Sequence, residues 1–288
     1  MDIGIRDGSL YQAGYRSAIE GLRTLGLSVV ELQIDRDGSM QSLTTGERVA
    51  LQTDADREQF AAACRAARVR VCALLCTQDF NAPDLAVEID YVAMAARAAV
   101  ALGAGTVRLD SIMTGQRELP LAERIRIFAA GCHAALEASA DTGVALGIEN
   151  HGHQGNDPAW MDGVLKAVPN PRLGLTLDVG NWYWYGHPLS RVYEIYHRYG
   201  ARAKHTHVKN IAYPAELREV QREVGYKYEE YCAPLPDGDI DMARVVRILR
   251  GCGYDSVLCV EDESLGKVPQ KDRPAVLARD IACLRAVF

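Results

Sequence analysis

The sequence lacks the features that would direct it to a membrane, to nucleic acid or to secretion. No apolar run approaches the roughly eighteen residues of a membrane helix. Any early apolar core of a signal peptide is interrupted by charged residues, namely Asp2, Arg6, Asp7, Arg16 and Glu20. The formal net charge of −6 gives no electrostatic reason to expect nucleic acid or an anionic membrane as a partner. We therefore expect a cytoplasmic protein.

Cysteine pairs and interdomain linkers are absent as well. None of the eight cysteines belongs to a CxxC pair, and most lie in apolar segments. Buried, reduced thiols are therefore expected in preference to disulfides or a thiolate metal site. No low-complexity stretch divides the 288 residues, which suit one large soluble domain with 48% hydrophobic and 24% charged residues.

Short apolar segments, often β-branched, alternate with helical segments along the whole chain. We predict strands at residues 3–6, 28–33, 69–76, 106–110, 144–149, 173–178, 203–208 and 256–261. Helices are predicted at residues 11–25, 59–68, 85–102, 121–142, 157–168, 190–199, 241–250 and 271–287. Strict alternation favours a parallel sheet, and eight repeats favour its closure. The expected fold is α/β, a single-domain (β/α)8 TIM barrel over residues 1–288.

The segment at about residues 211–238 interrupts this rhythm. We predict an extra charged helix at about residues 215–224, followed by a run that contains Tyr226, Tyr228 and Tyr231. A long insertion on the catalytic face of a barrel is usually a lid or a subunit contact. The segment is therefore predicted to be a lid or an interface, and its tyrosines offer a surface for a homo-oligomer.

Four of the later predicted strands end on a residue that can bind a metal: Glu149, Asp178, His207 and Glu261. The chemistry of parallel β/α barrels takes place at these C-terminal strand ends. Three carboxylates at neighbouring strand ends would repel one another unless a cation holds them. Because side chains alternate along a strand, His205 points to the same side as His207. Either histidine could be the ligand, and His207 is favoured because it stands nearer the strand end.

This donor set of two glutamates, one aspartate and one histidine predicts one divalent ion per chain. Mn²⁺ suits it best, with Mg²⁺, Co²⁺ and Zn²⁺ as alternatives. Further residues near the strand ends are candidate substrate contacts, and for each the alternative is surface exposure, core packing or a rim ion pair. They are Arg108, His151, His153, Asn181, Trp182, His187, His205 and Lys209, with Arg6, Glu31 and Asp110 as further candidates for the pocket wall.

Four motifs carry a family resemblance: Ile-Glu149-Asn, Leu-Asp178-Val-Gly, His207-Val-Lys and Val-Glu261. Through them, nearly the whole chain resembles the xylose isomerase-like TIM barrels. That superfamily includes sugar isomerases and epimerases, inosose dehydratase and endonuclease IV. The resemblance implies that the four numbered residues are the metal ligands, and that the two glutamates are catalytic groups on opposite faces of the substrate.

The expected chemistry is proton transfer next to a carbonyl. A metal that chelates a carbonyl oxygen and an adjacent hydroxyl acidifies the neighbouring C–H, and a glutamate that removes this proton gives a metal-stabilised enediolate. Returning the proton gives epimerisation or isomerisation. We therefore predict a metal-dependent isomerase or epimerase that acts on a sugar, keto-sugar or cyclitol. A dehydratase or lyase similar to inosose dehydratase is the alternative, because His151 and His153 could protonate a leaving hydroxyl.

Three positions depart from the ketose 3-epimerases of this superfamily, which carry Glu, His and Arg where this chain has Gly155, Asn181 and Tyr213. Different substrate contacts are therefore expected. No glycine-rich cradle or cluster of basic residues marks a phosphate site. Endonuclease IV needs three metals and further histidines, so an AP endonuclease is disfavoured. A binding protein that has lost catalysis is disfavoured by the intact ligand set.

Overall fold

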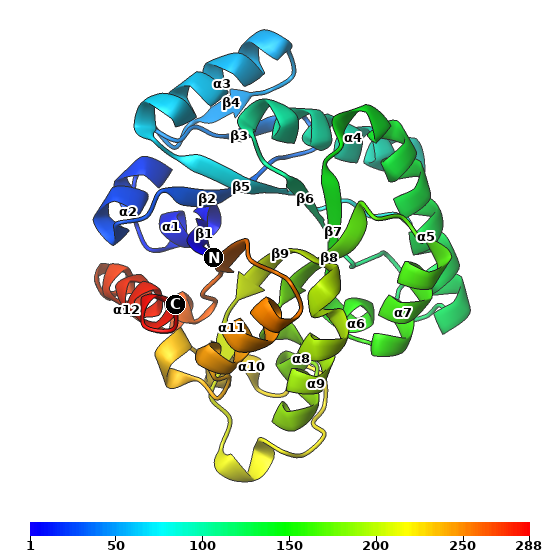
Figure 1. The fold of residues 1–288 in the computed structure, drawn as a ribbon, viewed down its shortest axis with the longest axis vertical. Helices are drawn as coiled ribbons and strands as arrows, with labels where there is room; N and C mark the ends of the chain where they lie inside the picture. Colours follow the sequence, from blue (N-terminus) through cyan, green and yellow to red (C-terminus); the bar gives the residue numbers. More distant parts are fainter.

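The computed structural model describes residues 1–288, and its centre is a closed barrel of eight parallel strands (Figure 1). Each strand lies within one residue of its predicted bounds, so the predicted TIM barrel is confirmed. Around the barrel, the strands follow one another as β1 (Asp2–Arg6), β12 (Val257–Val260), β9 (Ala203–Val208), β8 (Leu173–Asp178), β7 (Ala145–Glu149), β6 (Thr106–Leu109), β5 (Arg70–Leu75) and β2 (Val29–Gln33).

An outer layer of helices surrounds the barrel (Figure 1). The main ones are α2 (Ala18–Leu25), α3 (Asp54–Ala67), α4 (Leu85–Leu102), α5 (Leu121–Ala138), α7 (Pro158–Ala167), α9 (Leu189–Tyr199), α11 (Met242–Gly251) and α12 (Arg273–Arg285). Asp157 caps α7 by accepting the N–H of Ala159, with Pro158 in the first turn as predicted. None of the helices is both long enough and apolar enough to span a bilayer.

The helix predicted at residues 11–25 is in fact two helices, α1 (Asp7–Gln12) and α2. Gly14 lies between them with φ +96°, a backbone conformation that residues other than glycine rarely adopt. Ser17 then starts α2, because its hydroxyl accepts the N–H of Glu20 at 3.2 Å. The prediction of one continuous helix was therefore wrong.

The prediction of a charged helix at about residues 215–224 is also wrong. The structure has a single 3-10 turn at Ala215–Leu217 and a short helix, α10 (Tyr228–Tyr231). Two-residue strands β10 (Asn210–Ile211) and β11 (Cys232–Ala233) pair as an antiparallel ribbon at the base of the insertion. A second small hairpin, which the sequence analysis did not anticipate, joins β3 (Ser39–Gln41) to β4 (Arg48–Ala50).

Arg222 gives the physical reason for the missing helix. Its guanidinium carbon lies 4.5 Å from the ring centre of Tyr183 and 4.2 Å from that of Tyr213. The same group donates at 3.0 Å to the carbonyl oxygens of Tyr183 and His187. These tertiary contacts hold the segment against α8 (Asn181–Trp184), and they override the local helical tendency of its charged residues.

Candidate metal centre

Glu149, Asp178, His207 and Glu261 converge at the C-terminal end of the barrel. One donor atom from each side chain lies within 4.8 Å of the donor atoms of the other three. The register explains this convergence, since Asp178 stands beside His207 across β8 and β9, and Glu149 ends the neighbouring β7. All four residues are buried, with at most 6% of any of them exposed. Their role as ligands remains a prediction.

The ring of His207 is oriented by Glu31 on β2. His207 Nε2 lies 2.7 Å from Glu31 Oε2, whereas Nδ1 lies 3.0 Å from Glu149 Oε1 and 3.4 Å from Glu261 Oε2. An ionised carboxylate only accepts hydrogen bonds, so Nε2 donates to Glu31 and Nδ1 faces the other donors. A carboxylate that holds the far nitrogen of a histidine is the usual support for a histidine that ligates a metal.

The electrostatics of His207 fit an exchange of a proton for a cation. Burial opposes the charged ring, but the carboxylates of Glu31, Glu261 and Glu149 outweigh it and raise the pKa of His207 well above its usual range. The metal-free ring is therefore protonated on both nitrogens. A cation between the four donors would take the place of the Nδ1 proton.

Each glutamate of the cluster has its own arginine. Arg108 on β6 forms a buried ion pair with Glu149, and Arg6 at the end of β1 pairs with Glu261. Burial opposes the ionisation of Glu149, but Arg108 and His207 hold its pKa well below the usual range. For Glu261 the opposing charges are Lys209, His207 and Arg6, with the same result for its pKa. Both carboxylates are therefore ionised at neutral pH.

One carboxylate oxygen of Asp178 accepts two backbone hydrogen bonds, and the other accepts none. Its Oδ1 accepts the backbone N–H groups of Gly180 and Asn181, each at 2.8 Å. Its Oδ2 is buried and accepts no hydrogen bond, although Lys209 Nζ lies 3.3 Å away. Burial, opposed mainly by Lys209, raises the pKa of Asp178 to about 7. An orphaned buried carboxylate oxygen among three further donors fits a divalent cation.

Asn150 fixes the ends of β7 and β8 relative to each other. Its Oδ1 accepts the N–H of Asp178 at 2.8 Å, and its Nδ2 donates to the carbonyl oxygen of Asp178 at 2.9 Å. The side chain is fully buried. The asparagine that follows Glu149 in the sequence is therefore a structural clamp for two of the four donors, a role that its place in the motif did not reveal.

A small polar cavity of about 180 Å³ opens above the cluster. Leu75 is its one apolar wall residue, and the others are Arg6, Thr77, Arg108, Asp110, Glu149, His151, Lys209, Glu261 and Glu263. Arg108, His151 and Lys209, three of the predicted substrate contacts, thus line the cavity together with both glutamates. Thr77 and Glu263 were missed, although each follows a strand end closely, which is the signal that could have found them.

Three other candidate contacts lie below or outside the cavity. Trp182 is fully buried and stacks on Tyr199 with ring centres 5.7 Å apart, so it belongs to the core. His205 points into the barrel interior, where its Nε2 lies 3.4 Å from Glu31 Oε1. Asn181 is close to the cluster, with Nδ2 3.5 Å from Glu149 Oε1.

His153 and His187 lie together beside Tyr185, away from the residues that line the cavity. The ring centre of Tyr185 is 5.8 Å from that of His153 and 5.2 Å from that of His187. His187 Nε2 also lies 3.4 Å from the carbonyl oxygen of Asn156. The structure therefore places these two histidines in an aromatic cluster outside the cavity.

A model of the xylose isomerase-like TIM barrel family matches residues 19–287. The chain belongs to this family. An uncharacterized protein of Methanocaldococcus jannaschii, MJ1311, is 24% identical over 150 residues, which are 51% of this chain and 44% of that protein. The chain therefore aligns with less than half the length of this curated relative.

Solved structures of family-like barrels superpose over essentially the whole chain. The IolI protein, whose crystal structure holds a zinc atom, has a TM-score of 0.74 and 15% identity, with 100% of this chain and 99% of IolI covered. The 3-keto-D-glucoside 4-epimerase YcjR of E. coli has a TM-score of 0.70 and 14% identity, with 99% of each chain covered. The probable 3-DHS dehydratase AsbF of Bacillus anthracis has a TM-score of 0.68 and 16% identity, with 99% of each chain covered. At these identities the likeness is one of fold.

Proposed function

We propose that this protein is a divalent-metal-dependent isomerase or epimerase that acts on a sugar, keto-sugar or cyclitol. The observation that carries the proposal is the cluster of Glu149, Asp178, His207 and Glu261 at the floor of a polar cavity. Such a donor set at the C-terminal face of a β/α barrel is suited to metal-assisted proton transfer. Sugar epimerases and a sugar phosphate isomerase/epimerase among the fold neighbours agree with it.

Asp178 and His207 would hold the cation together with the two glutamates, and Mn²⁺ suits the donors best. A divalent cation there polarises a carbonyl and acidifies the neighbouring C–H. The strand order places β8 and β9 between β7 and β12, so Glu149 and Glu261 approach the cavity from either side of Asp178 and His207. Being ionised, one glutamate can accept the substrate proton and, once protonated, return it to the adjacent carbon for isomerisation. For epimerisation, the other glutamate would first take up a proton from solvent and then deliver it to the opposite face.

The remaining cavity residues bind and orient the substrate. Arg108 and Lys209 supply fixed donors for hydroxyl or carbonyl oxygens, and with Arg6 they keep the glutamates from taking up protons prematurely. Residues 211–238 act as a lid at the rim, because the hydroxyl of Tyr228 donates to Glu263, which in turn lies 2.6 Å from Lys209 Nζ. The insertion thereby contacts the wall of the cavity itself.

A dehydratase is the second candidate, and His151 is the observation that favours it. Its ring lines the cavity, with Nδ1 3.0 Å from Asp110 Oδ1. Burial favours the neutral ring, but the Asp110 hydrogen bond and the charge of Glu149 raise the pKa of His151 overall. A protonated imidazole in this place can protonate a leaving hydroxyl after a glutamate has removed the neighbouring proton.

The test is exchange of substrate C–H protons in D₂O. The chain is loaded with Mn²⁺, its metal content is measured, and keto-sugars and cyclitols are followed by NMR. We expect about one metal per chain and deuterium incorporation that is abolished in Glu149→Gln and Glu261→Gln. The surface variant Glu123→Gln, on an exposed pair with Arg126, is the matched control and keeps full exchange.

The other outcomes separate the alternatives. Loss of water from the substrate, dependent on His151, identifies the dehydratase. Metal binding without exchange on any substrate, or failure to bind metal at all, overturns catalysis by enolisation and favours a binding protein. Cleavage of abasic DNA by the zinc-loaded chain would reinstate an endonuclease.

A further inference from the structure

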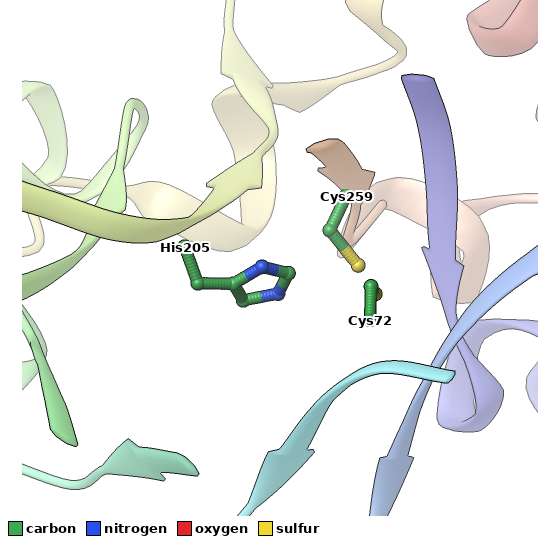
Figure 2. A group of neighbouring side chains, drawn as sticks. All are labelled: Cys72, His205 and Cys259. Atoms are coloured by element: carbon green, nitrogen blue, oxygen red, sulfur yellow. The ribbon is translucent and has the colours of Figure 1, made fainter. Parts of the chain in front are cut away.

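We propose that the barrel interior holds a second metal site, built from Cys72, His205 and Cys259 and suited to a soft divalent ion such as Zn²⁺. Figure 2 shows the imidazole of His205 directed toward the two thiol groups. One donor atom from each of the three side chains lies within 4.8 Å of the donor atoms of the other two. The site is separate from the cavity, and the inference does not depend on the proposed function.

The three residues come from three strands and meet only because the barrel closes. Cys72 is on β5, His205 on β9 and Cys259 on β12, and their exposed fractions are 8%, 2% and 0%. Gly4 on β1 leaves room for Val257, since a Cβ atom there would lie 2.8 Å from Val257 Cγ1. Val29 and Val257 pack against the two cysteines and complete an apolar wall.

An unpartnered nitrogen supports a ligand at this place. His205 Nε2 is buried and has no hydrogen-bond partner, and the same is true of Glu31 Oε1, which lies 3.4 Å away. Glu31 Oε2 in turn lies 3.8 Å from Cys259 Sγ. Buried polar atoms are seldom left without close partners, so this loosely paired nitrogen and oxygen favour an ion bound beside them. Glu31 therefore borders the site through its contacts with His205 and Cys259.

The charge and size of the site also fit a divalent ion. Two thiolates cancel the charge of Zn²⁺, and a neutral imidazole adds none, so the core of the complex can stay buried without an uncompensated charge. Zinc–sulfur and zinc–nitrogen bonds of about 2.3 and 2.0 Å place tetrahedral donors roughly 3.5–3.8 Å apart. The donors, which lie within 4.8 Å of one another, would therefore approach by at most about 1.3 Å on binding. Binding releases the two thiol protons to solvent.

Glu31 joins the two sites. One of its oxygens accepts the hydrogen bond from His207 Nε2, and the other faces His205. An ion on Cys72, His205 and Cys259 would thus lie one side chain away from the four-donor cluster. Such an ion would link β5, β9 and β12 in the barrel interior beneath the cavity.

Cobalt distinguishes the second site from the first. Co²⁺ bound to thiolates gives an intense near-ultraviolet charge-transfer band, which the carboxylates and imidazole of the four-donor cluster cannot produce. The full-length, reduced chain is titrated with Co²⁺ and then with Zn²⁺. We expect the band to appear in the wild type, to disappear when Zn²⁺ displaces Co²⁺, and to be lost in the double variant Cys72→Ala/Cys259→Ala.

Cys132→Ala is the matched control, because Cys132 is a fully buried cysteine on α5 outside the cluster, and this variant keeps the band. Circular dichroism checks that the double variant is folded. If it is not, the single variant Cys72→Ser, at the most exposed member, still shifts or weakens the band. Absence of the band in the reduced wild type, or its survival in a folded double variant, overturns the second site. Neither result bears on the metal of the four-donor cluster.

Discussion

Replacing Arg108 by methionine removes the cation that neutralises Glu149. The Arg108 side chain is only 5% exposed, and its carboxylate partners Glu149 and Asp110 are 2% and 14% exposed. Methionine keeps much of the apolar stem of the side chain and removes the guanidinium, so the variant tests mainly the charge. Two carboxylates would then face each other across the wall of the cavity without their shared cation.

The magnitude follows from the burial. Breaking a buried ion pair by removing one partner costs about 3–5 kcal/mol, because the other charge is left uncompensated. With an unfolding entropy of about 2.1 cal/mol/K per residue, the whole chain has roughly 0.6 kcal/mol/K, so Tm should fall by about 5–8 °C. In saturating Mn²⁺ the loss should be smaller than in EDTA, because a bound cation replaces the missing positive charge.

Differential scanning calorimetry in EDTA and in Mn²⁺ measures both effects. Arg126→Met is the control, since Arg126 pairs with Glu123 on the surface, where the two side chains are 67% and 38% exposed. Exposed pairs contribute at most about 1 kcal/mol, so this Tm should change by less than about 2 °C. If Arg108→Met lowers Tm in EDTA by no more than Arg126→Met does, the buried ion pair does not contribute the expected stability.

Three further outcomes are expected. Glu31→Gln should weaken Mn²⁺ binding about 10–100-fold in isothermal titration calorimetry, because the carboxylate that orients the metal-site histidine is lost, and an unchanged affinity would contradict this. The carboxyl of Asp280 has its pKa raised to about 9 by burial and by its neighbour Asp262, so from about pH 4 to 9 the folded chain keeps a proton that the unfolded chain releases. Stability should therefore fall as pH rises through this range, by up to about 1.4 kcal/mol per unit, and urea unfolding of Asp280→Asn should show a flatter dependence. Gly147→Ala should lower stability by about 1–3 kcal/mol, because its Cβ would lie 2.6 Å from the Thr176 hydroxyl, and a rise in Tm would refute the close approach of β7 and β8.

The strands could be predicted because each is a local apolar run between turn residues. The helices whose bounds were wrong depend instead on information beyond the local pattern. Residues 11–25 contain enough apolar positions for one helix, but a left-handed Gly14 and the Ser17 cap divide them. The charged segment at residues 215–224 fails to form a helix because Arg222 is drawn onto two tyrosine rings that lie elsewhere in the sequence.

The convergence of the four donors was predictable for a related reason. Parallel strands in a closed barrel bring all their C-terminal ends to one face, so residues at strand ends meet without further information. The partner of His207 was not predictable, because β2 and β9 are not neighbours in the barrel and Glu31 reaches the histidine across the interior. Trp182 was predicted to contact substrate because it lies four positions after a strand end, but its side chain is fully buried in the core.

The charges explain how these four donors can lie together in the folded chain. Glu149 has Arg108, Glu261 has Arg6 and Asp178 has Lys209, while a proton on His207 occupies the place among the donors where a cation would bind. Clustered carboxylates ordinarily repel and destabilise a fold. Here each carboxylate has a cationic side chain nearby, which reduces the repulsion among them. Binding then requires the release of a proton and little rearrangement, because Asn150, Glu31 and the backbone N–H groups on Asp178 already hold the donors in place.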